Sequence, residues 1–201
     1  MISFKNHLLA VISSGNKNRL RKGALSERLN LKDEFIERNS IKISNHLIKN
    51  FNLLNKNVHL FYPISKNKEV NTWYIHKAIN SNSIIFTSFY EKTKERWECI
   101  SFNPSVKFTN GKLNIPVPID YKLETFDKIE VILVPLLVFD KFGNRIGYGK
   151  GIYDSILTQL NKNCLKIGLS FFEVSKENIQ VDFYDQSLDY CQTPNQLYKF
   201  K

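Results

Sequence analysis

The sequence lacks an apolar run long enough to cross a bilayer, and it has only three cysteines among 201 residues. A membrane-spanning helix needs about 20 mostly apolar residues, so no membrane partner is expected. Cys99, Cys164 and Cys191 are odd in number and widely spaced, without a C-x-x-C pair or a histidine cluster. A disulfide framework or a zinc site is therefore not expected, and the pattern favours buried, reduced thiols in a cytoplasmic protein.

The chain also lacks internal repeats, low-complexity tracts and obvious linkers. A chain of this length can bury a sizeable core as one domain. The apolar stretch His7–Ile12 is shorter than the about 7–15 apolar residues of a signal peptide, and no A-x-A site follows it. We therefore predict a helical N-terminal extension over residues 1–16 and a single domain over residues 17–201.

The net charge of +10 and the pI near 9.4 raise the question of a nucleic-acid partner. The lysines are dispersed, however, and basic and aromatic residues do not interleave as in the usual RNA-binding signature. A small polyanion such as a nucleotide fits the same charge. The charge alone does not decide between these ligands, but the absence of a recognition motif predicts no nucleic-acid partner.

Hydrophobic periodicity predicts alternating helices and strands. Ile129–Val134 is the most apolar run and predicts a central parallel strand, Trp97–Phe102 is a candidate edge strand, and Pro104–Phe126 is predicted to be irregular. The alternation of strands and helices predicts a layered α/β domain. The other predicted helices are Lys17–Arg28, Leu31–Phe51, Thr72–Asn80 and Ile152–Leu160, and the other predicted strands are Asn57–Tyr62, Ser83–Ser88 and, as the last, Leu165–Phe172.

A glycine-rich loop connects the central strand to the next helix. Four of the eight glycines lie between residues 143 and 151, and Arg145 and Lys150 add two cations to the same segment. Clustered glycines indicate positive φ angles or a close approach of the backbone to a ligand. A loop that opens a helix at the carboxyl end of a strand also exposes N–H groups that favour phosphate.

The named phosphate-binding fingerprints do not fit this loop. A P-loop would need Ser or Thr after Gly149-Lys150, where the chain has Gly151, and the dinucleotide pattern would need glycine at Ile152. A glycine-rich turn by itself is more often a tight connection. The two flanking cations and the apolar strand before the loop shift the balance toward a phosphate site.

The longer pattern from Phe139 to Asp154, F-D-x-x-G-x-R-x-G-x-G-x-G-x-Y-D, closely resembles the signature of the 5-formyltetrahydrofolate cyclo-ligases, also called 5,10-methenyltetrahydrofolate synthetases. The resemblance implies a three-layer, Rossmann-like α/β domain with a mostly parallel central sheet flanked by helices. It also implies a monomeric enzyme that uses ATP, Mg²⁺ and 5-formyltetrahydrofolate to form 5,10-methenyltetrahydrofolate.

Two further segments resemble the same family. Lys17–Arg21 is similar to a K-x-x-L-R segment whose cations contact ATP, although two cations one helical turn apart also fit a solvated basic face. Lys68–Thr72 is similar to an E-[IV]-x-T segment in which the glutamate, here Glu69, holds the pterin ring. A carboxylate suits that role because it accepts paired N–H donors, but a glutamate that caps the next helix fits as well.

Near the end of the chain, Ile167–Phe171 is similar to the I-G-L-A-F segment of the family. By the same resemblance Asp154 and Asp185 are associated with Mg²⁺, which prefers hard carboxylate oxygens. Ion pairs with lysine or arginine, or Asx turns, are the alternative roles for these two residues.

The resemblance thus implies a complete set of site residues. Arg145 and Lys150 would be catalytic, and Asp154 and Asp185 would bind the metal. The ATP contacts would come from Lys17, Asn18, Arg19, Leu20, Arg21, Arg145, Ile146, Gly147, Tyr148, Gly149, Lys150, Gly151, Ile152 and Tyr153. The folate contacts would come from Glu69, Tyr148, Gly149, Lys150, Gly151, Ile152 and Tyr153.

Several positions depart from the family pattern, and most of them are expected around the folate rather than the phosphates. They keep open a non-catalytic relative that binds only nucleotide, or a related α/β protein that binds a sugar phosphate or coenzyme A. These departures are Leu113, Val117, Leu136, Ile152, Val174 and Tyr184.

Overall fold

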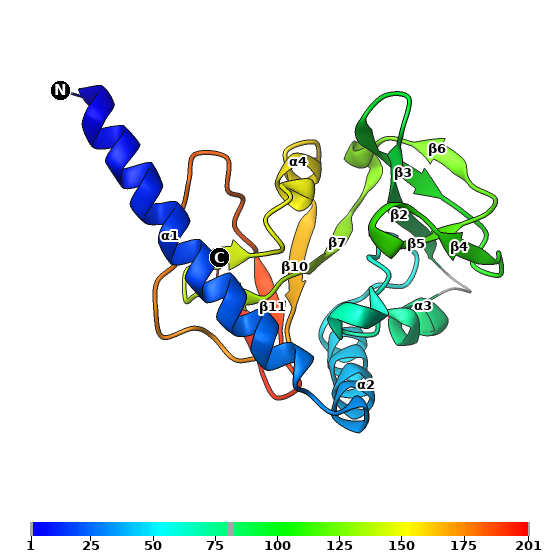
Figure 1. Cartoon of the computed structure of the whole chain (residues 1–201). Coiled ribbons are helices and arrows are strands. Elements are labelled where there is room, and N and C mark those ends of the chain that lie inside the picture. Colours follow the sequence, from blue (N-terminus) through cyan, green and yellow to red (C-terminus); the bar gives the residue numbers. More distant parts are fainter. Residues whose placement is uncertain (1, 80–82, 201) are drawn as a thin grey trace.

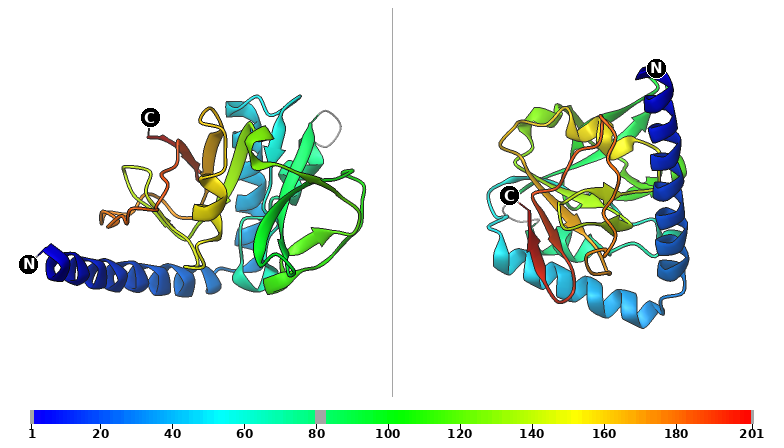
Figure 2. Two further views of the ribbon diagram at one scale, coloured as in Figure 1. Left: turned by 90° about the horizontal axis from the view of Figure 1, so that it is seen from above. Right: turned by 90° about the vertical axis from the view of Figure 1, so that its left-hand side faces the viewer.

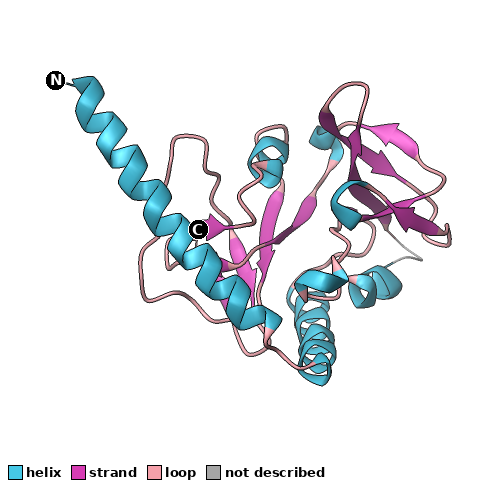
Figure 3. Cartoon of the chain, in the orientation of Figure 1, coloured by secondary structure: helices cyan, strands magenta, loops and turns pink. Residues whose placement is uncertain are grey.

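The structure of the chain, a computed structural model, describes residues 2–79 and 83–200, and for residues 2–14 it describes the backbone alone. Its centre is an eight-stranded sheet in the order β12-β11-β10-β7-β1-β2-β3-β6 (Figures 1 and 3). The strands are β1 (Asn57–His59), β2 (Ile84–Glu91), β3 (Arg96–Ser101), β6 (Lys122–Glu124), β7 (Val131–Pro135), β10 (Leu165–Leu169), β11 (Tyr190–Gln192) and β12 (Leu197–Lys199).

The middle of the sheet is parallel and its two margins are antiparallel. Strand β7 pairs in parallel with β1 and β10, and these two strands pair in parallel with β2 and β11. Strands β3, β6 and β12 add on in the antiparallel sense. The apolar segment predicted as a central parallel strand is thus confirmed, with Val131 in register with Val58 on one side and Leu165 on the other.

Strand β7 shows why the sheet carries layers on both faces. Val131 and Leu133 enter one core with α2 (Asp33–Asn50) and α3 (Trp73–Ile79), whereas Ile132 and Val134 enter a second core with α4 (Ile152–Leu157). Alternate strand residues point to opposite faces, so a continuous apolar strand requires cover on both sides. The predicted α/β fold, with a mostly parallel sheet between helices, is confirmed.

Helix α1 (Ile2–Leu29) continues without a break across the predicted boundary at residue 16. Its N-terminal part projects beyond the sheet, while its C-terminal part runs along the body of the molecule (Figure 2). Helix α2 is amphipathic and buries Ile43 and Leu47 completely. No helix in the described ranges combines the length and apolarity needed to cross a membrane, and all three cysteines are buried and unpaired.

Some local predictions were wrong. The strand predicted at Trp97–Phe102 is not at the edge, because β6 pairs with its outer side. The segment Pro104–Phe126, predicted to be irregular, contains β6 and the hairpin of β4 (Phe108–Asn110) and β5 (Pro116–Pro118). These strands are three residues long, so they have no visible sequence period and depend on pairing with partners.

Other boundaries moved as well. Leu165–Phe172 is not the last strand, because β11 and β12 follow it. The loop after β7 contains a short hairpin of β8 (Val138–Phe139) and β9 (Arg145–Ile146). Helix α4 ends at Leu157 rather than residue 160, and the predicted end of α3 at Asn80 lies outside the described residues.

Candidate functional site

A cleft of about 550 Å³ opens at the carboxyl ends of β1 and β7. Phe61 and Tyr62 follow β1 into its wall, and Pro135 closes β7 beside them. Helix α1, the glycine-rich loop (residues 143–151), the strands β2 and β3, and segments around residues 113–115 and 182–185 contribute further lining residues. The volume lies in the range of about 300–1,000 Å³ that is usual for small-molecule sites, and the position is where open α/β sheets bind ligands.

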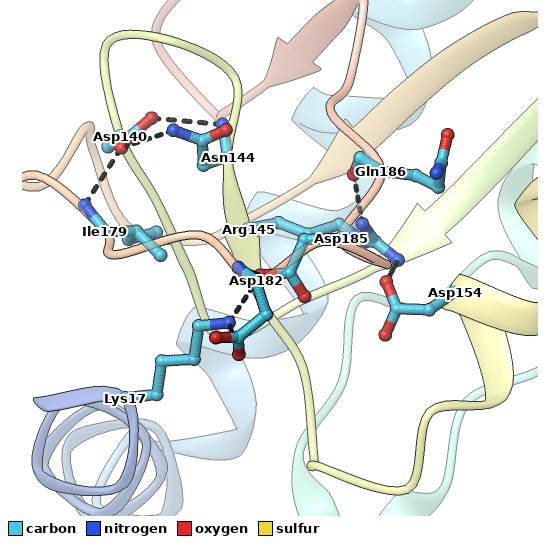
Figure 4. A network of polar contacts seen from close by, with 9 residues as sticks. All are labelled: Lys17, Asp140, Asn144, Arg145, Asp154, Ile179, Asp182, Asp185 and Gln186. Carbon is cyan, nitrogen blue, oxygen red and sulfur yellow. Dashed lines mark hydrogen bonds and ion pairs between the residues drawn. The ribbon is translucent and has the colours of Figure 1, made fainter. Parts of the chain in front are cut away.

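The base of the glycine-rich loop is fixed by a buried carboxylate. Asp140 accepts hydrogen bonds from the backbone N–H groups of Phe142 and Asn144 at 2.9 and 3.0 Å, and from Asn144 Nδ2 at 3.0 Å. It also accepts from the backbone N–H of Ile179 at 2.9 Å (Figure 4). Asp140 therefore holds the β8–β9 hairpin and ties it to the segment that carries residues 182–186.

Gly149 shows why this loop needs glycine. Its φ angle is +81°, and a Cβ atom placed there would lie 3.1 Å from Cζ of Arg21. Arg21 comes this close because its Nε donates a hydrogen bond of 2.8 Å to the carbonyl oxygen of Gly147. The left-handed backbone and the close approach of the Arg21 side chain therefore both disfavour a larger residue at this position.

Cations and carboxylates gather at one end of the cleft, which we call the phosphate end (Lys17, Arg21, Arg145, Lys150, Asp154, Asp182 and Asp185). Figure 4 shows five of these side chains, Lys17, Arg145, Asp154, Asp182 and Asp185. Lys17 pairs with Asp182 at 2.6 Å and with Asp185. Burial opposes the charge of Lys17, but the hydrogen bonds to both carboxylates outweigh it and raise the pKa of Lys17. The Arg145 guanidinium donates to Asp154 Oδ1 at 2.7 Å and to the carbonyl oxygen of Gln186.

The donor set at this end fits a magnesium ion that arrives with a nucleotide. Mg²⁺ in nucleotide sites is usually held by one or two carboxylates, with phosphate oxygens and waters as its other ligands. Asp154 and Asp185 both line the cleft, and the described part of the chain has no cluster of three or more His, Cys, Asp or Glu side chains that could hold a metal alone. Both carboxylates already pair with cations of the chain, as their alternative role predicted.

The opposite part of the cleft, which we call the Glu69 end, is built around a buried carboxylate. Glu69 Oε2 accepts from the backbone N–H of Ile64 at 2.7 Å, and Oε1 accepts from the Tyr148 hydroxyl at 2.6 Å. Arg28, only 5% exposed, donates to the same hydroxyl and, at 3.2 Å, to the carbonyl oxygen of Leu136. Burial raises the pKa of Glu69, while the two hydrogen bonds and the charge of Arg28 act in the opposite direction.

The cleft brings together most of the predicted site residues but not all of them. Asn18, Arg19 and Leu20 do not line it, although the Asn18 side chain accepts a hydrogen bond from Arg21 at its border. Arg19 instead pairs with Glu177. The predicted residues that line the cleft are Lys17, Arg21, Glu69, Arg145, Ile146, Gly147, Tyr148, Gly149, Lys150, Gly151, Ile152, Tyr153, Asp154 and Asp185.

Sequence reasoning missed several residues of the site. Arg28 had a readable signal, because it lies eleven residues after Lys17 and therefore on the same helical face. Tyr62, Trp97 and Ser88 reach the cleft from strands or strand ends, and nothing in their local sequence distinguishes them from core residues. The hydroxyl oxygen of Ser88 forms a hydrogen bond of 2.7 Å with Nε2 of the buried His59.

The departures from the family pattern are distributed unevenly. Leu113 and Ile152 line the cleft. Val117 and Leu136 are buried, and Val174 packs against the second core. Tyr184 is 75% exposed. Two of the departures therefore bear directly on the shape of the cleft.

Comparison with known proteins agrees with this geometry. A model of the 5-formyltetrahydrofolate cyclo-ligase family matches residues 13–194. A probable 5-formyltetrahydrofolate cyclo-ligase of Schizosaccharomyces pombe is 27% identical over 90% of this chain and 96% of its own. The 5-formyltetrahydrofolate cyclo-ligase of Mycoplasma pneumoniae is 38% identical, but the match covers 35% of this chain and 44% of the relative, which is less than half of its length.

Solved structures show the same fold. The 5,10-methenyltetrahydrofolate synthetase of Aquifex aeolicus superimposes with a TM-score of 0.75 at 24% identity, and the match covers 92% of this chain and 93% of the other. The 5,10-methenyltetrahydrofolate synthetase of Mycoplasma pneumoniae gives 0.67 at 23% identity, covering 92% and 99%. With the family match across most of the sequence, the conclusion is that this chain belongs to the 5-formyltetrahydrofolate cyclo-ligase family.

Proposed function

We propose that this protein catalyses the ATP-dependent cyclisation of 5-formyltetrahydrofolate to 5,10-methenyltetrahydrofolate, with release of ADP and phosphate. The observation that carries the proposal is one cleft that joins two chemically different ends. The phosphate end offers four cations and a glycine-rich backbone, and the Glu69 end offers a buried acceptor among apolar walls. The names of the matching relatives support the same reaction.

The proposed reaction has two steps. The formyl oxygen attacks the γ-phosphorus of ATP and displaces ADP, which gives a phosphorylated imidate at N5. N10 then attacks the former formyl carbon, N10 loses its proton, and the oxygen departs with the phosphate. The methenyl bridge closes at the expense of one ATP, because phosphorylation converts a poor leaving oxygen into a good one.

At the phosphate end, the residues would act by position and charge. Phosphoryl transfer requires alignment and neutralisation of developing charge more than covalent help from the protein. Lys17, Arg21 and Lys150 line the cleft with their cations, and Gly149 lets the backbone come close. Arg145 is held by Asp154 and Gln186, so its cation is fixed before any ligand arrives.

Mg²⁺ would neutralise phosphate oxygens at this end when bound, with Asp154 and Asp185 as the residues that hold it. Since both carboxylates pair with Arg145 and Lys17, the phosphates and the metal would exchange partners with these ion pairs. The acidic and basic residues would thus neutralise each other until the nucleotide arrives.

At the Glu69 end, the carboxylate would bind the pterin ring of the folate. A 2-amino-4-oxo pterin presents adjacent N–H donors, which a carboxylate accepts in pairs. Tyr148 and Tyr153 lie beside Glu69, and Tyr62 and Trp97 add aromatic walls. Burial raises the pKa of the Tyr153 hydroxyl, so this ring stays neutral next to the ligand.

The proposal also covers the location, the oligomeric state and the partners of the enzyme. We place it in the cytoplasm as a monomer without a nucleic-acid or membrane partner. The three buried, unpaired thiols support the cytoplasmic location.

The test is to mix protein, Mg-ATP and 5-formyltetrahydrofolate and to record the near-ultraviolet band of the methenyl product. We expect the band to grow with time and to need all three components. Heat from Mg-ATP binding without product would indicate a relative that binds only nucleotide. No product, together with thermal stabilisation by a sugar phosphate, would contradict the folate assignment.

A further inference from the structure

Arg28 is a buried cation to which the reaction above gives no role. Its side chain leaves α1 beneath the cleft and reaches Tyr148, with the guanidinium carbon 5.3 Å from the centre of that ring. Tyr148 in turn contacts Glu69. Three segments far apart in the sequence therefore meet in one row of polar contacts at the Glu69 end.

The direction of these hydrogen bonds is fixed by chemistry. A guanidinium only donates, so the Tyr148 oxygen accepts from Arg28 and its single hydrogen points to Glu69 Oε1. Ile64 donates its backbone N–H to Oε2. Both oxygens of Glu69 thus act as acceptors, which favours the ionised carboxylate. A carboxylate has about four acceptor sites, so about one on each oxygen is left for a ligand.

We propose that Arg28 is a positioning residue: acting through the Tyr148 hydroxyl, it keeps the Glu69 carboxylate ionised and oriented so that it accepts a pair of N–H donors from the substrate. The inference rests on the proposed function, because it assumes that the Glu69 end binds the folate. Arg28 itself does not line the cleft.

A purely structural role explains the row of contacts less well. Arg28 fastens α1 to the strand end at Leu136, but a neutral donor would do this without burying a charge. Its Nε is buried and has no hydrogen-bond partner in the described part of the chain, which costs stability. A buried arginine that costs stability is explained if the Glu69 carboxylate needs a cation near it.

The charged and titratable groups that interact with Glu69 are Arg28 from α1, Tyr148 from the glycine-rich loop and Tyr153 at the start of α4. Burial is the largest influence and raises the pKa of Glu69, whereas Arg28 lowers it. Removing the cation therefore leaves burial less opposed and raises the pKa further. At any given pH a larger share of Glu69 is then protonated, and a protonated carboxyl accepts one N–H donor fewer.

The experiment compares Arg28→Met, which keeps the length and removes the charge, with Arg28→Lys, which keeps a charge. For Arg28→Met we expect the KM for 5-formyltetrahydrofolate to rise about 10- to 100-fold, the scale of one charged hydrogen bond, while the KM for Mg-ATP stays within about threefold. Arg28→Lys should recover part of the loss. Arg38→Met, the same change on the exposed side of α2, is the matched control and should have no effect.

The pH dependence separates positioning from mere support. In Arg28→Met the folate KM should fall as the pH is raised, while the wild type is flat over the same range, and adding Glu69→Gln should abolish the slope. An unchanged folate KM in Arg28→Met overturns the inference. So do equal rises in both KM values at every pH, because these would indicate loss of structure.

A second readout does not depend on catalysis. The carboxyl pKa of Glu69, followed by ¹³C NMR, should be higher in Arg28→Met than in the wild type, and an equal pKa overturns the inference even if turnover is intact. Tyr148→Phe, which removes only the connecting hydroxyl, should raise the pKa too and covers the case in which Arg28→Met does not fold. If the wild type makes no methenyl product, the proposed function fails while this measurement still decides the role of Arg28.

Discussion

The two ends of the cleft are built in different ways. The phosphate end gathers its groups from α1, the glycine-rich loop, the start of α4 and residues 182–185. Its carboxylates are partly exposed, with the side chain of Asp154 36% and that of Asp182 53% exposed, although their cation partners are only 5% and 11% exposed. At the Glu69 end, three distant segments meet, and Glu69 and Arg28 are each 5% exposed. Charges near water exchange partners at little cost, whereas a buried group that loses its partner costs much more. The first end is therefore suited to exchange, and the second to fixed recognition.

Lys150→Ala should have the largest effect and should act on the phosphate end alone. The Lys150 side chain is exposed and lines the cleft, so its loss should leave the fold intact. We expect kcat to fall about 10²- to 10³-fold, as for the removal of one charge-stabilising donor. Steady-state assays and thermal unfolding provide the two measurements. Nearly wild-type turnover would remove the loop from catalysis.

Asp140→Ala tests whether the phosphate end depends on its buried anchor. The substitution leaves three backbone N–H groups and one amide group without their acceptor, so we expect a loss of about 3 kcal/mol in the free energy of unfolding. Urea denaturation measures the loss. Asp140→Asn is the matched control, since it keeps the size and one acceptor oxygen, and it should lose less. Equal losses in both variants would show that the charge, not the acceptor geometry, holds the hairpin.

Glu69→Gln should affect the Glu69 end alone. One acceptor oxygen becomes an NH₂ group that faces donors, so we expect the folate KM to rise about 10- to 100-fold, with the KM for Mg-ATP unchanged. Initial rates at varied concentrations of each substrate make the comparison. If both KM values changed together, the two ends would not be independent sites of recognition.

The smallest expected effect is a loss of folding stability in acid, caused by the buried His59. His59 is fully buried, and burial lowers the pKa of its imidazole to about 3. Below its unfolded pKa of 6.5, the unfolded chain binds a proton that the folded chain does not, so stability falls as the pH is lowered from 6.5 toward 3. At pH 5 the loss should be about 2 kcal/mol.

Urea denaturation at pH 7 and pH 5 measures this loss, with His59→Gln as the comparison. The variant should have a flatter pH dependence even if it is less stable at pH 7. His46, which is only half-buried, offers the matched control His46→Gln. An equal acid slope in the wild type and His59→Gln would show that other groups cause the loss.

The contrast between the two ends also explains what the sequence could predict. Strand β7 and the glycine-rich loop are each one continuous stretch of sequence. The apolar run of the first and the glycine content of the second were therefore enough to predict both. The edge position of β6 and the presence of β11 and β12 depend on pairing between strands. Strands of three residues are too short to show a hydrophobic period in the sequence, so they were not predicted. The sequence could place Arg28 on the same helical face as Lys17, but not identify its partners, which are 108 and 120 residues away. Chemistry carried by one segment was therefore visible, and chemistry assembled by folding was not.

Helix α1 connects the two ends as a single rigid element. Lys17 and Arg28 lie eleven residues apart, close to three full turns, so both leave the same side of the helix about 16 Å from each other. Deleting one residue between them would turn Arg28 by about 100° relative to Lys17. The length of this stretch is thus constrained as strictly as the identity of its charges, and insertions should be tolerated before residue 17 but not within 17–28.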